Sequence, residues 1–197
     1  MMSKDRRPTA AVASALALAG VLGLGGCGFI GQPKNASAEL SEWFTVTSPV
    51  FRDGRELPTR YACKSYPGGA GTTPPLRWSG TPAGTRSFAI VVDDPDAATG
   101  AYVHWVIGGI DGTVHELVEG AQLSKTVEGL NTSEKVGYAP PCPPRGEQHR
   151  YRFTIYALDT EVPFRSGAPL KESLGAIAEH TVGRGRITGI FGSDESP

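Results

Sequence analysis

Four segments of the chain have the composition and length of β-strands. They are rich in Val, Ile, Thr, Phe and Tyr and are bounded by Gly, Pro or Asp. They cover residues 43–50, 87–92, 103–110 and 151–158. Residues 88–92 form an uninterrupted apolar run, which is typical of a central strand covered on both faces. In the last segment Tyr151, Phe153, Ile155 and Ala157 share one face, because side chains alternate along a strand.

Helical patterns are few. Residues 170–181 place Leu170, Leu174, Ile177 and Ala178 on one stripe directly after Pro169, which predicts an amphipathic helix. Residues 121–126 form a weaker candidate for a second helix. Many strands and few helices in a chain of 197 residues predict a mainly β fold, either a sandwich or an open barrel, with a few peripheral helices.

The N-terminal segment has the pattern of an export signal. Residues 1–7 carry three basic side chains, and residues 9–24 contain no charge. This apolar stretch is short and rich in glycine, which favours a secretory signal over a membrane span. It ends in Leu24-Gly25-Gly26-Cys27, which resembles the lipobox of bacterial lipoproteins. The alternative is an ordinary cleaved signal in which Cys27 has no role.

The lipobox divides the chain into three parts. Residues 1–26 are the expected signal peptide, residues 27–40 a tether rich in Gly, Pro, Ser and Asn, and residues 41–197 one folded domain. Acyl chains such as palmitate on Cys27 would hold the exported protein on the outer face of the cell membrane. After Cys27 the chain has 16 basic and 19 acidic residues, a net charge of −3. This balance gives no basic field for nucleic acid, which is not an expected partner.

Two further cysteines remain once Cys27 is assigned to lipid. Disulfides persist in proteins outside the cytoplasm, so Cys63 and Cys142 are expected to pair with each other. The alternative is a pair of buried free thiols.

Candidate chemistry lies where the predicted strands begin or end. The run Asp93-Asp94-Pro95-Asp96-Ala97 follows the buried strand, although such a run alone is an ordinary turn. A lone strand histidine such as His104 is more often a packing residue than a ligand. His149 and Tyr151 are more informative, because their spacing of two directs an imidazole and a phenol to the same face. A stiff run of four prolines, at positions 140, 141, 143 and 144, precedes them.

Taken together, these segments resemble the phosphatidylethanolamine-binding protein family, in particular its bacterial branch, often described as Raf kinase inhibitor-like. The ordered set consists of TPPLRW at 73–78, SFAIVVDDPDA at 87–97, HWV at 104–106, GY at 137–138, PCPP at 141–144 and HRYRFTIYAL at 149–158. Each motif is weak by itself, and the order and spacing carry the resemblance. It extends over residues 43–191.

The resemblance implies a sandwich of two antiparallel sheets with a small cavity near one surface. Its ligand pocket would be formed by Asp94, Asp96, His104, Pro143, Pro144, His149 and Tyr151. Members bind phosphate-like anions or phospholipid headgroups there, so an anionic small molecule or a headgroup is the expected ligand. The histidines and the phenol would donate hydrogen bonds to it, and the aspartates would orient the histidines or accept from an ammonium group. Ala139 and Pro140 stand where the family commonly has glycines, which suggests a stiffer rim.

Two other function classes compete with a binding protein. A hydrolase would need a nucleophile, yet no G-x-S-x-G motif occurs and Cys142 is expected to be paired. A zinc site of two histidines and two aspartates lacks the usual close ligand spacing, so neither a metal nor a cofactor is expected. Inhibition of a protease or another protein partner is the second alternative, because relatives are described as inhibitors. The sequence therefore favours a non-catalytic, membrane-anchored binding protein.

Overall fold

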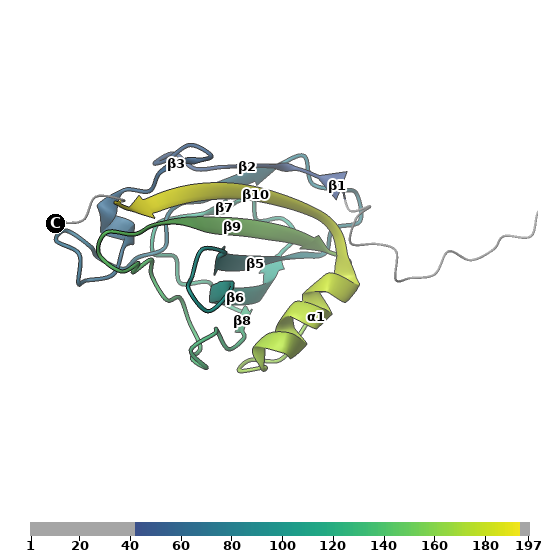
Figure 1. The fold of residues 1–197 in the computed structure, drawn as a ribbon. Helices are drawn as coiled ribbons and strands as arrows, with labels where there is room; N and C mark the ends of the chain where they lie inside the picture. Colours follow the sequence, from purple (N-terminus) through teal and green to yellow (C-terminus); the bar gives the residue numbers. More distant parts are fainter. Residues whose placement is uncertain (1–41, 194–197) are drawn as a thin grey trace, which may run out of the picture. The chain divides into compact units, whose positions relative to one another are not determined.

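The computed structural model describes residues 42–193, and their main feature is a pair of packed β-sheets (Figure 1). The larger sheet follows the order β1 (Glu42–Trp43), β10 (Thr181–Gly192), β9 (Gln148–Leu158), β5 (Ser87–Asp94), β6 (Tyr102–Asp111) and β8 (Val127–Glu128), and β3 (Arg55–Glu56) also pairs with β10. The smaller sheet has the order β2 (Thr45–Thr47), β4 (Leu76–Ser79) and β7 (Glu116–Leu117). Adjacent strands are antiparallel except that β1 and β3 run parallel to β10. The predicted mainly β sandwich is therefore confirmed.

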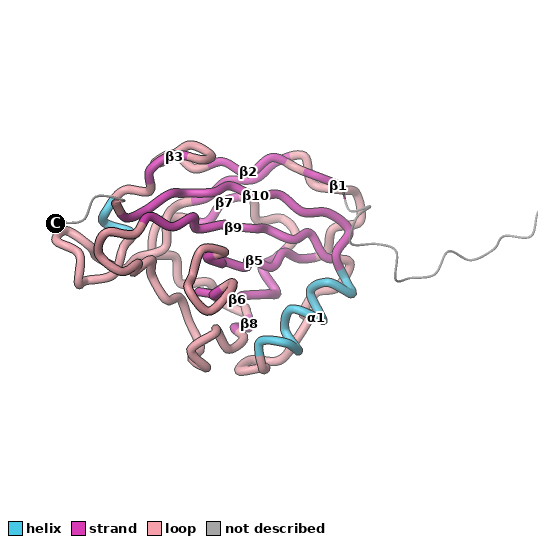
Figure 2. Tube along the Cα trace, viewed as in Figure 1, coloured by secondary structure: helices cyan, strands magenta, loops and turns pink. Residues whose placement is uncertain are grey.

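The main hydrophobic core lies between the two sheets. Val46, Leu76 and Trp78 come from the smaller sheet and pack in one cluster with Phe88 and Phe153 of the larger sheet. The opposite face of the larger sheet has a second cluster, which α1 (Leu170–His180) covers through Ile177. Figures 1 and 2 show this helix beside the sheet as the one α-helix of the described region; a single 3-10 turn, η1 (Thr59–Tyr61), accompanies it.

Strand β5 is the central strand that the apolar run predicted. All eight of its residues are buried. Phe88, Ile90 and Val92 belong to the cluster between the sheets, whereas Ala89 and Val91 belong to the cluster under α1. A strand with both faces covered has no need of alternating polar residues, which is why the run is continuous.

Two predicted elements differ in the structure. The segment predicted as one strand at 43–50 is divided, since Trp43 pairs with Arg184 in the larger sheet and Val46 pairs with Trp78 in the smaller one. The weak helix predicted at 121–126 is wrong, and a turn is present instead. Lys125 has a φ of 62°, which ends any right-handed helix within the segment. Six residues are also too few to repay helix nucleation without strong packing.

Strand β10 was not predicted, although its twelve residues make it the longest strand of the described region. Four glycines lower its intrinsic preference for a strand. The structure gives a reason for one of them: a Cβ at Gly185 would lie 2.6 Å from the carbonyl oxygen of Phe44 and 2.6 Å from a methyl group of Val46. Because Gly185 has no side chain, residues 43–46 can pass directly over β10 as they leave the larger sheet and enter the smaller one.

Within residues 42–193, no helix has the length and apolar character needed to cross a membrane. The predicted signal peptide, the tether and Cys27 lie outside the described residues.

Candidate ligand-binding pocket

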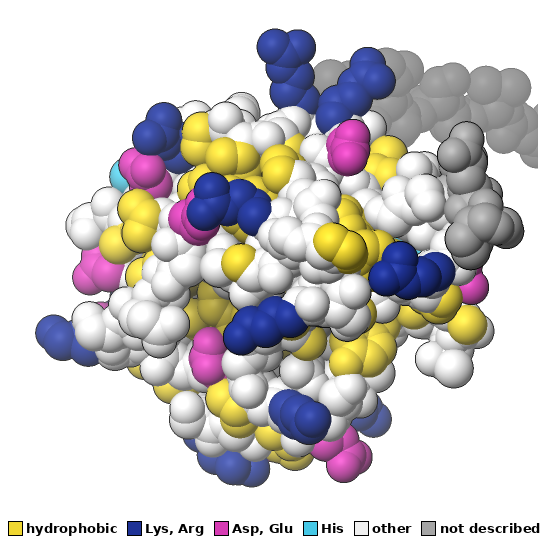
Figure 3. All heavy atoms as spheres, turned by 90° about the vertical axis from the view of Figure 1, so that its left-hand side faces the viewer, with side chains coloured by type: hydrophobic (Ala, Val, Ile, Leu, Met, Phe, Trp, Pro, Cys, Tyr) yellow, Lys and Arg dark blue, Asp and Glu magenta, His cyan; other side chains and the backbone are white. Residues whose placement is uncertain are grey.

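A pocket of about 440 Å³ opens where three neighbouring strands begin or end. Strand β5 ends at Asp94, which pairs in register with Tyr102 at the start of β6, and β9 begins beside them. These strand ends lie at the left of Figure 1, the side that faces the viewer in Figure 3. The lining consists of these strand ends and the proline-rich loop: Cys63, Asp94, Ala97, Ala98, Tyr102, His104, Ala139, Pro140, Cys142, Pro143, Pro144, Glu147, His149 and Tyr151. We call it the histidine pocket.

His149 is held between two carboxylates. Its Nδ1 lies 2.7 Å from Asp94 Oδ2, and its Nε2 lies 3.0 Å from Glu147 Oε2. Asp94 also accepts a hydrogen bond of 2.8 Å from the backbone N–H of Asp96, which fixes its carboxylate. Burial disfavours the charged ring, but the hydrogen bonds to Asp94 and Glu147 outweigh it and raise the pKa of His149 above its ordinary value. When the ring carries both protons, each nitrogen donates to one of the two carboxylates.

His104 has the opposite electrostatic character. Its Nδ1 donates to the carbonyl oxygen of Ala139 at 2.7 Å. Burial lowers the pKa of His104, and the hydrogen bond to Ala139 only partly compensates. The ring is therefore neutral near pH 7, and its Nε2 has a free lone pair that can accept a hydrogen bond.

Tyr151 supplies a second donor beside His149. Their rings are stacked with centroids 6.4 Å apart. Burial raises the pKa of Tyr151 far above its ordinary value, and the nearby Asp94 adds to the effect, so the phenol keeps its proton. No residue within 42–193 forms a hydrogen bond with this hydroxyl. It can therefore donate to a ligand without breaking an existing bond.

The proline-rich loop forms a fixed rim. Cys63 and Cys142 form a disulfide, as predicted from the cysteine count. The backbone N–H of Cys63 donates to Pro141 O at 2.8 Å, and the Tyr66 hydroxyl donates to Pro143 O at 2.8 Å. Proline lacks a backbone N–H and has a fixed φ, so these links hold a loop that cannot join the sheet.

The comparison with known proteins agrees with this arrangement. The sequence profile of the phosphatidylethanolamine-binding protein family matches residues 47–192. The chain belongs to this family. The predicted family membership is thereby confirmed over most of the folded part.

Family members from distant microorganisms are similar along most of their length. "Putative lipoprotein LppC" of Mycobacterium tuberculosis is 38% identical, over 88% of this chain and 92% of its own. A UPF0098 protein of Chlamydia muridarum is 36% identical, over 76% of this chain and 99% of its own. The crystal structure of a phosphatidylethanolamine-binding protein homologue from Chlamydia trachomatis has a TM-score of 0.70, with 35% identity over 78% of this chain and all of that one. The structure of Escherichia coli YbcL also has a TM-score of 0.70, with 32% identity over 76% and 98%.

Six of the seven residues expected in the pocket of this family member do line it. They are Asp94, His104, Pro143, Pro144, His149 and Tyr151. Asp96 does not line it, because its carboxylate accepts hydrogen bonds from the backbone N–H and the guanidinium of Arg150, at 2.9, 2.9 and 2.5 Å. These hydrogen bonds lower the pKa of Asp96 to about 2. Asp96 thus fastens the turn after β5 to strand β9.

Sequence reasoning missed Glu147, which contacts His149 directly. The spacing of two that joins His149 to Tyr151 also joins Glu147 to His149, so the signal was present in the sequence. Glu147 precedes the first residue of the strand, where side-chain alternation is not a dependable guide to direction.

Proposed function

We propose that this protein is an exported, lipid-anchored binding protein that takes a phosphate-bearing ligand, such as a phospholipid headgroup, into the histidine pocket without catalysing a reaction. The observation that carries the proposal is the buried His149 ring, held between the carboxylates of Asp94 and Glu147, beside the unpartnered hydroxyl of Tyr151. A charged donor and a neutral donor on one wall are suited to two oxygens of a phosphate group.

Binding requires an exchange at His149. Its Nε2 is occupied by Glu147, whose side chain is 53% exposed and can turn outward. A phosphate oxygen would take the place of the Glu147 carboxylate, while the contact between Nδ1 and Asp94 stays in place. The displaced carboxylate would remain at the rim, where it can accept hydrogen bonds from an ammonium group. His104 Nε2 can accept from the same ammonium group or from a protonated phosphate oxygen.

The charge balance favours a zwitterion over a simple anion. Asp94 and Glu147 carry two negative charges against the single positive charge of His149. A phosphate dianion would therefore add to an excess of negative charge. Phosphoethanolamine carries its own ammonium and reduces that repulsion. Figure 3 shows Lys and Arg side chains scattered over this side of the structure among apolar and acidic ones, so no continuous basic surface offers another anion site there.

The contacts of His149 and Cys142 argue against catalysis by these two residues. A general base needs a free lone pair, and His149 donates through both nitrogens. His104 keeps a lone pair at Nε2, which in this proposal accepts a hydrogen bond from the ligand. Cys142 is oxidised in the disulfide and offers no thiolate. Inhibition of a protease or another protein partner stays a prediction from the family resemblance.

The similarity to the mycobacterial relative supports the lipid anchor. That match covers 88% of the 197 residues, so about 24 residues lie outside it. Even if all of them were at the start of the chain, the match would include Cys27. The relative is named as a lipoprotein, and the shared segment contains the residue that would carry the acyl chains.

The binding proposal can be tested by calorimetric titration of the detergent-solubilised protein with phosphoethanolamine and with inorganic phosphate. His149→Ala should weaken binding by about 1.5 to 3 kcal/mol, and Tyr151→Phe by about 1 kcal/mol, because one removes a charged donor and the other a neutral one. Asp96→Asn is the control and should keep its affinity. Phosphorus NMR should recover the phosphoethanolamine unchanged. Release of inorganic phosphate would mean an enzyme, and the absence of saturable binding would reject the pocket.

A further inference from the structure

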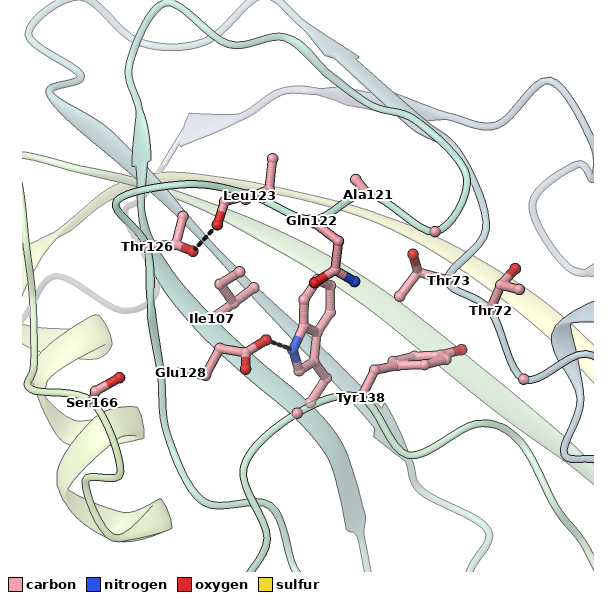
Figure 4. Close-up of a pocket in the computed structure, with 14 residues that line it drawn as sticks. Thr72, Thr73, Ile107, Ala121, Gln122, Leu123, Thr126, Glu128, Tyr138 and Ser166 are labelled. Atoms are coloured by element: carbon pink, nitrogen blue, oxygen red, sulfur yellow. Dashed lines mark hydrogen bonds between the residues drawn. The ribbon is translucent and has the colours of Figure 1, made fainter.

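A second cavity, of about 550 Å³, lies apart from the histidine pocket and shares no lining residue with it (Figure 4). Strand β6 supplies Trp105 and Ile107, β8 supplies Glu128, and four loops complete the lining. The loop residues are Gly71, Thr72, Thr73, Gly120, Ala121, Gln122, Leu123, Thr126, Gly137, Tyr138 and Ser166. We call it the threonine cavity.

Unpartnered hydroxyl groups are concentrated in this cavity. Within residues 42–193, five buried side-chain nitrogen or oxygen atoms have no hydrogen-bond partner, and three of these belong to residues of the cavity lining. They are the hydroxyls of Thr72, Thr73 and Tyr138. Thr73 is only 8% exposed, and burial raises the pKa of Tyr138, which therefore keeps its proton. Buried polar groups nearly always have a hydrogen-bond partner, so three unpartnered hydroxyls among the residues of one cavity suggest that a ligand binds there.

The remaining polar groups indicate what kind of ligand fits. Trp105 Nε1 donates to Glu128 Oε1 at 2.8 Å, which fixes the carboxylate and leaves its second oxygen as an acceptor (Figure 4). The amide of Gln122 can both donate and accept. The lining contains no Lys, Arg or His, so it offers no charged donor for an anion. Trp105 and Tyr138, with ring centroids 5.8 Å apart, add aromatic surface.

We propose that the threonine cavity binds a neutral polyhydroxylated ligand, such as a sugar ring. Hydroxyl groups both donate and accept, as do the Gln122 amide and the hydroxyls of Thr72, Thr73 and Tyr138. These three oxygens have almost no accessible surface, so their side chains would have to shift toward a bound ligand. The C–H faces of a sugar ring can pack on the aromatic surface, whose faces carry partial negative charge. The volume is within the range of small-molecule sites. The inference does not depend on phosphate binding, because the two pockets have no lining residue in common.

The test follows the indole N–H signal of Trp105 by NMR while glucose, N-acetylglucosamine or myo-inositol is added to the detergent-solubilised protein. The chain has three tryptophans, and Trp105→Phe assigns the signal. At least one of the three probes should shift it in a saturable way. Thr73→Val and Tyr138→Phe should each weaken binding about two- to tenfold and should not lower the melting temperature, because each removes a hydroxyl without a protein partner.

Two control variants and one variant of the cavity lining distinguish a sugar site in this cavity from a cation site or from binding elsewhere on the protein. Thr47→Val, an exposed residue of β2 that lines neither cavity, and His149→Ala should both keep the sugar affinity. Glu128→Gln should weaken sugar binding by no more than about tenfold, because the amide oxygen still accepts from Trp105 and only one acceptor for a neutral ligand is lost. The proposal is overturned if none of the three probes shifts the signal at tens of millimolar. It is equally overturned if only tetramethylammonium shifts it and Glu128→Gln abolishes that effect, since the cavity would then be a cation site.

Discussion

His149 donates from Nδ1 to Asp94 Oδ2 at 2.7 Å, and the two side chains are 7% and 5% exposed. They lie 55 residues apart in sequence, near the start of β9 and at the end of β5. Because β5 pairs directly with β9 in the sheet, the fold itself brings the two groups together. This buried pair links the stability of the protein to the protonation of its ligand pocket.

The first prediction concerns the pH dependence of stability. The pKa of His149 is raised by folding, so its stabilisation is fully present below the ordinary value of 6.5 and is lost as the pH rises through the raised pKa. The pKa of His104 is lowered, so stability is lost as the pH falls below 6.5 toward that lowered pKa. Urea unfolding from about pH 5 to about pH 9 should therefore show the greatest stability near the ordinary histidine pKa.

Two variants separate the contributions to this profile. His149→Gln should remove the loss of stability on the alkaline side and leave the loss on the acidic side. Asp94→Asn should lower the free energy of unfolding by about 2 to 3 kcal/mol at pH 6, because it removes one partner of a buried pair. Asp96→Asn is the matched control and should cost about 1 kcal/mol or less, since Arg150 opposite it is 60% exposed. A profile of His149→Gln with the same alkaline slope as the wild type would refute the assignment.

Elements with a strong local pattern could be predicted from the sequence. The central strand β5 is predictable because burial on both faces requires a continuous apolar run. The helix α1 is predictable because burial along one stripe places apolar residues at helical spacing. Strand β10 was missed because Gly185 and the other glycines serve tertiary contacts that a local pattern does not contain. The helix predicted around Lys125 is wrong because composition does not reveal a positive φ.

The pocket was predictable only as far as strand ends and the family motifs define it. His104, His149 and Tyr151 follow from their places on the strands. Asp96 was expected in the pocket. Its carboxylate instead accepts hydrogen bonds from Arg150 on the neighbouring strand, and a sequence pattern does not reveal such a partner. The orphan hydroxyls of Thr72 and Thr73 could not be foreseen, because only the folded structure shows which polar groups are left without partners.

The second prediction concerns the disulfide. The bond between Cys63 and Cys142 closes a loop of 79 residues and should contribute on the order of 4 kcal/mol by restricting the unfolded chain. The variant with both Cys63→Ser and Cys142→Ser should therefore melt at a lower temperature than the wild type. Reductant should lower the melting temperature of the wild type and leave that of the double variant unchanged. Equal melting temperatures for the two proteins without reductant would show that the bond contributes nothing.

The third prediction concerns the anchor. Cys27→Ala should move the protein from the membrane fraction to the soluble fraction of a bacterial host that processes lipoproteins, because acyl chains rather than a spanning helix would hold it. Cys63→Ser serves as the control and should leave the protein with the membranes. Retention of Cys27→Ala in the membrane fraction after a high-salt wash would contradict lipid anchoring.

The last prediction concerns Glu147, which occupies the position on His149 that a ligand oxygen would need. Glu147→Gln removes a competing negative charge and weakens the contact of 3.0 Å with Nε2. Inorganic phosphate should then bind about tenfold more tightly at pH 6, where His149 still carries its proton, which corresponds to about 1.4 kcal/mol. Phosphoethanolamine should gain less, because the same substitution also removes an acceptor for its ammonium group. The ratio of the two affinities should therefore shift toward phosphate.

Glu116→Gln is the matched control for Glu147→Gln, because the Glu116 carboxylate pairs with Arg77 on the smaller sheet, and it should change neither affinity. Weaker phosphate binding by Glu147→Gln would instead mean that Glu147 holds the imidazolium in place for the ligand, and the competition between carboxylate and phosphate would have to be abandoned.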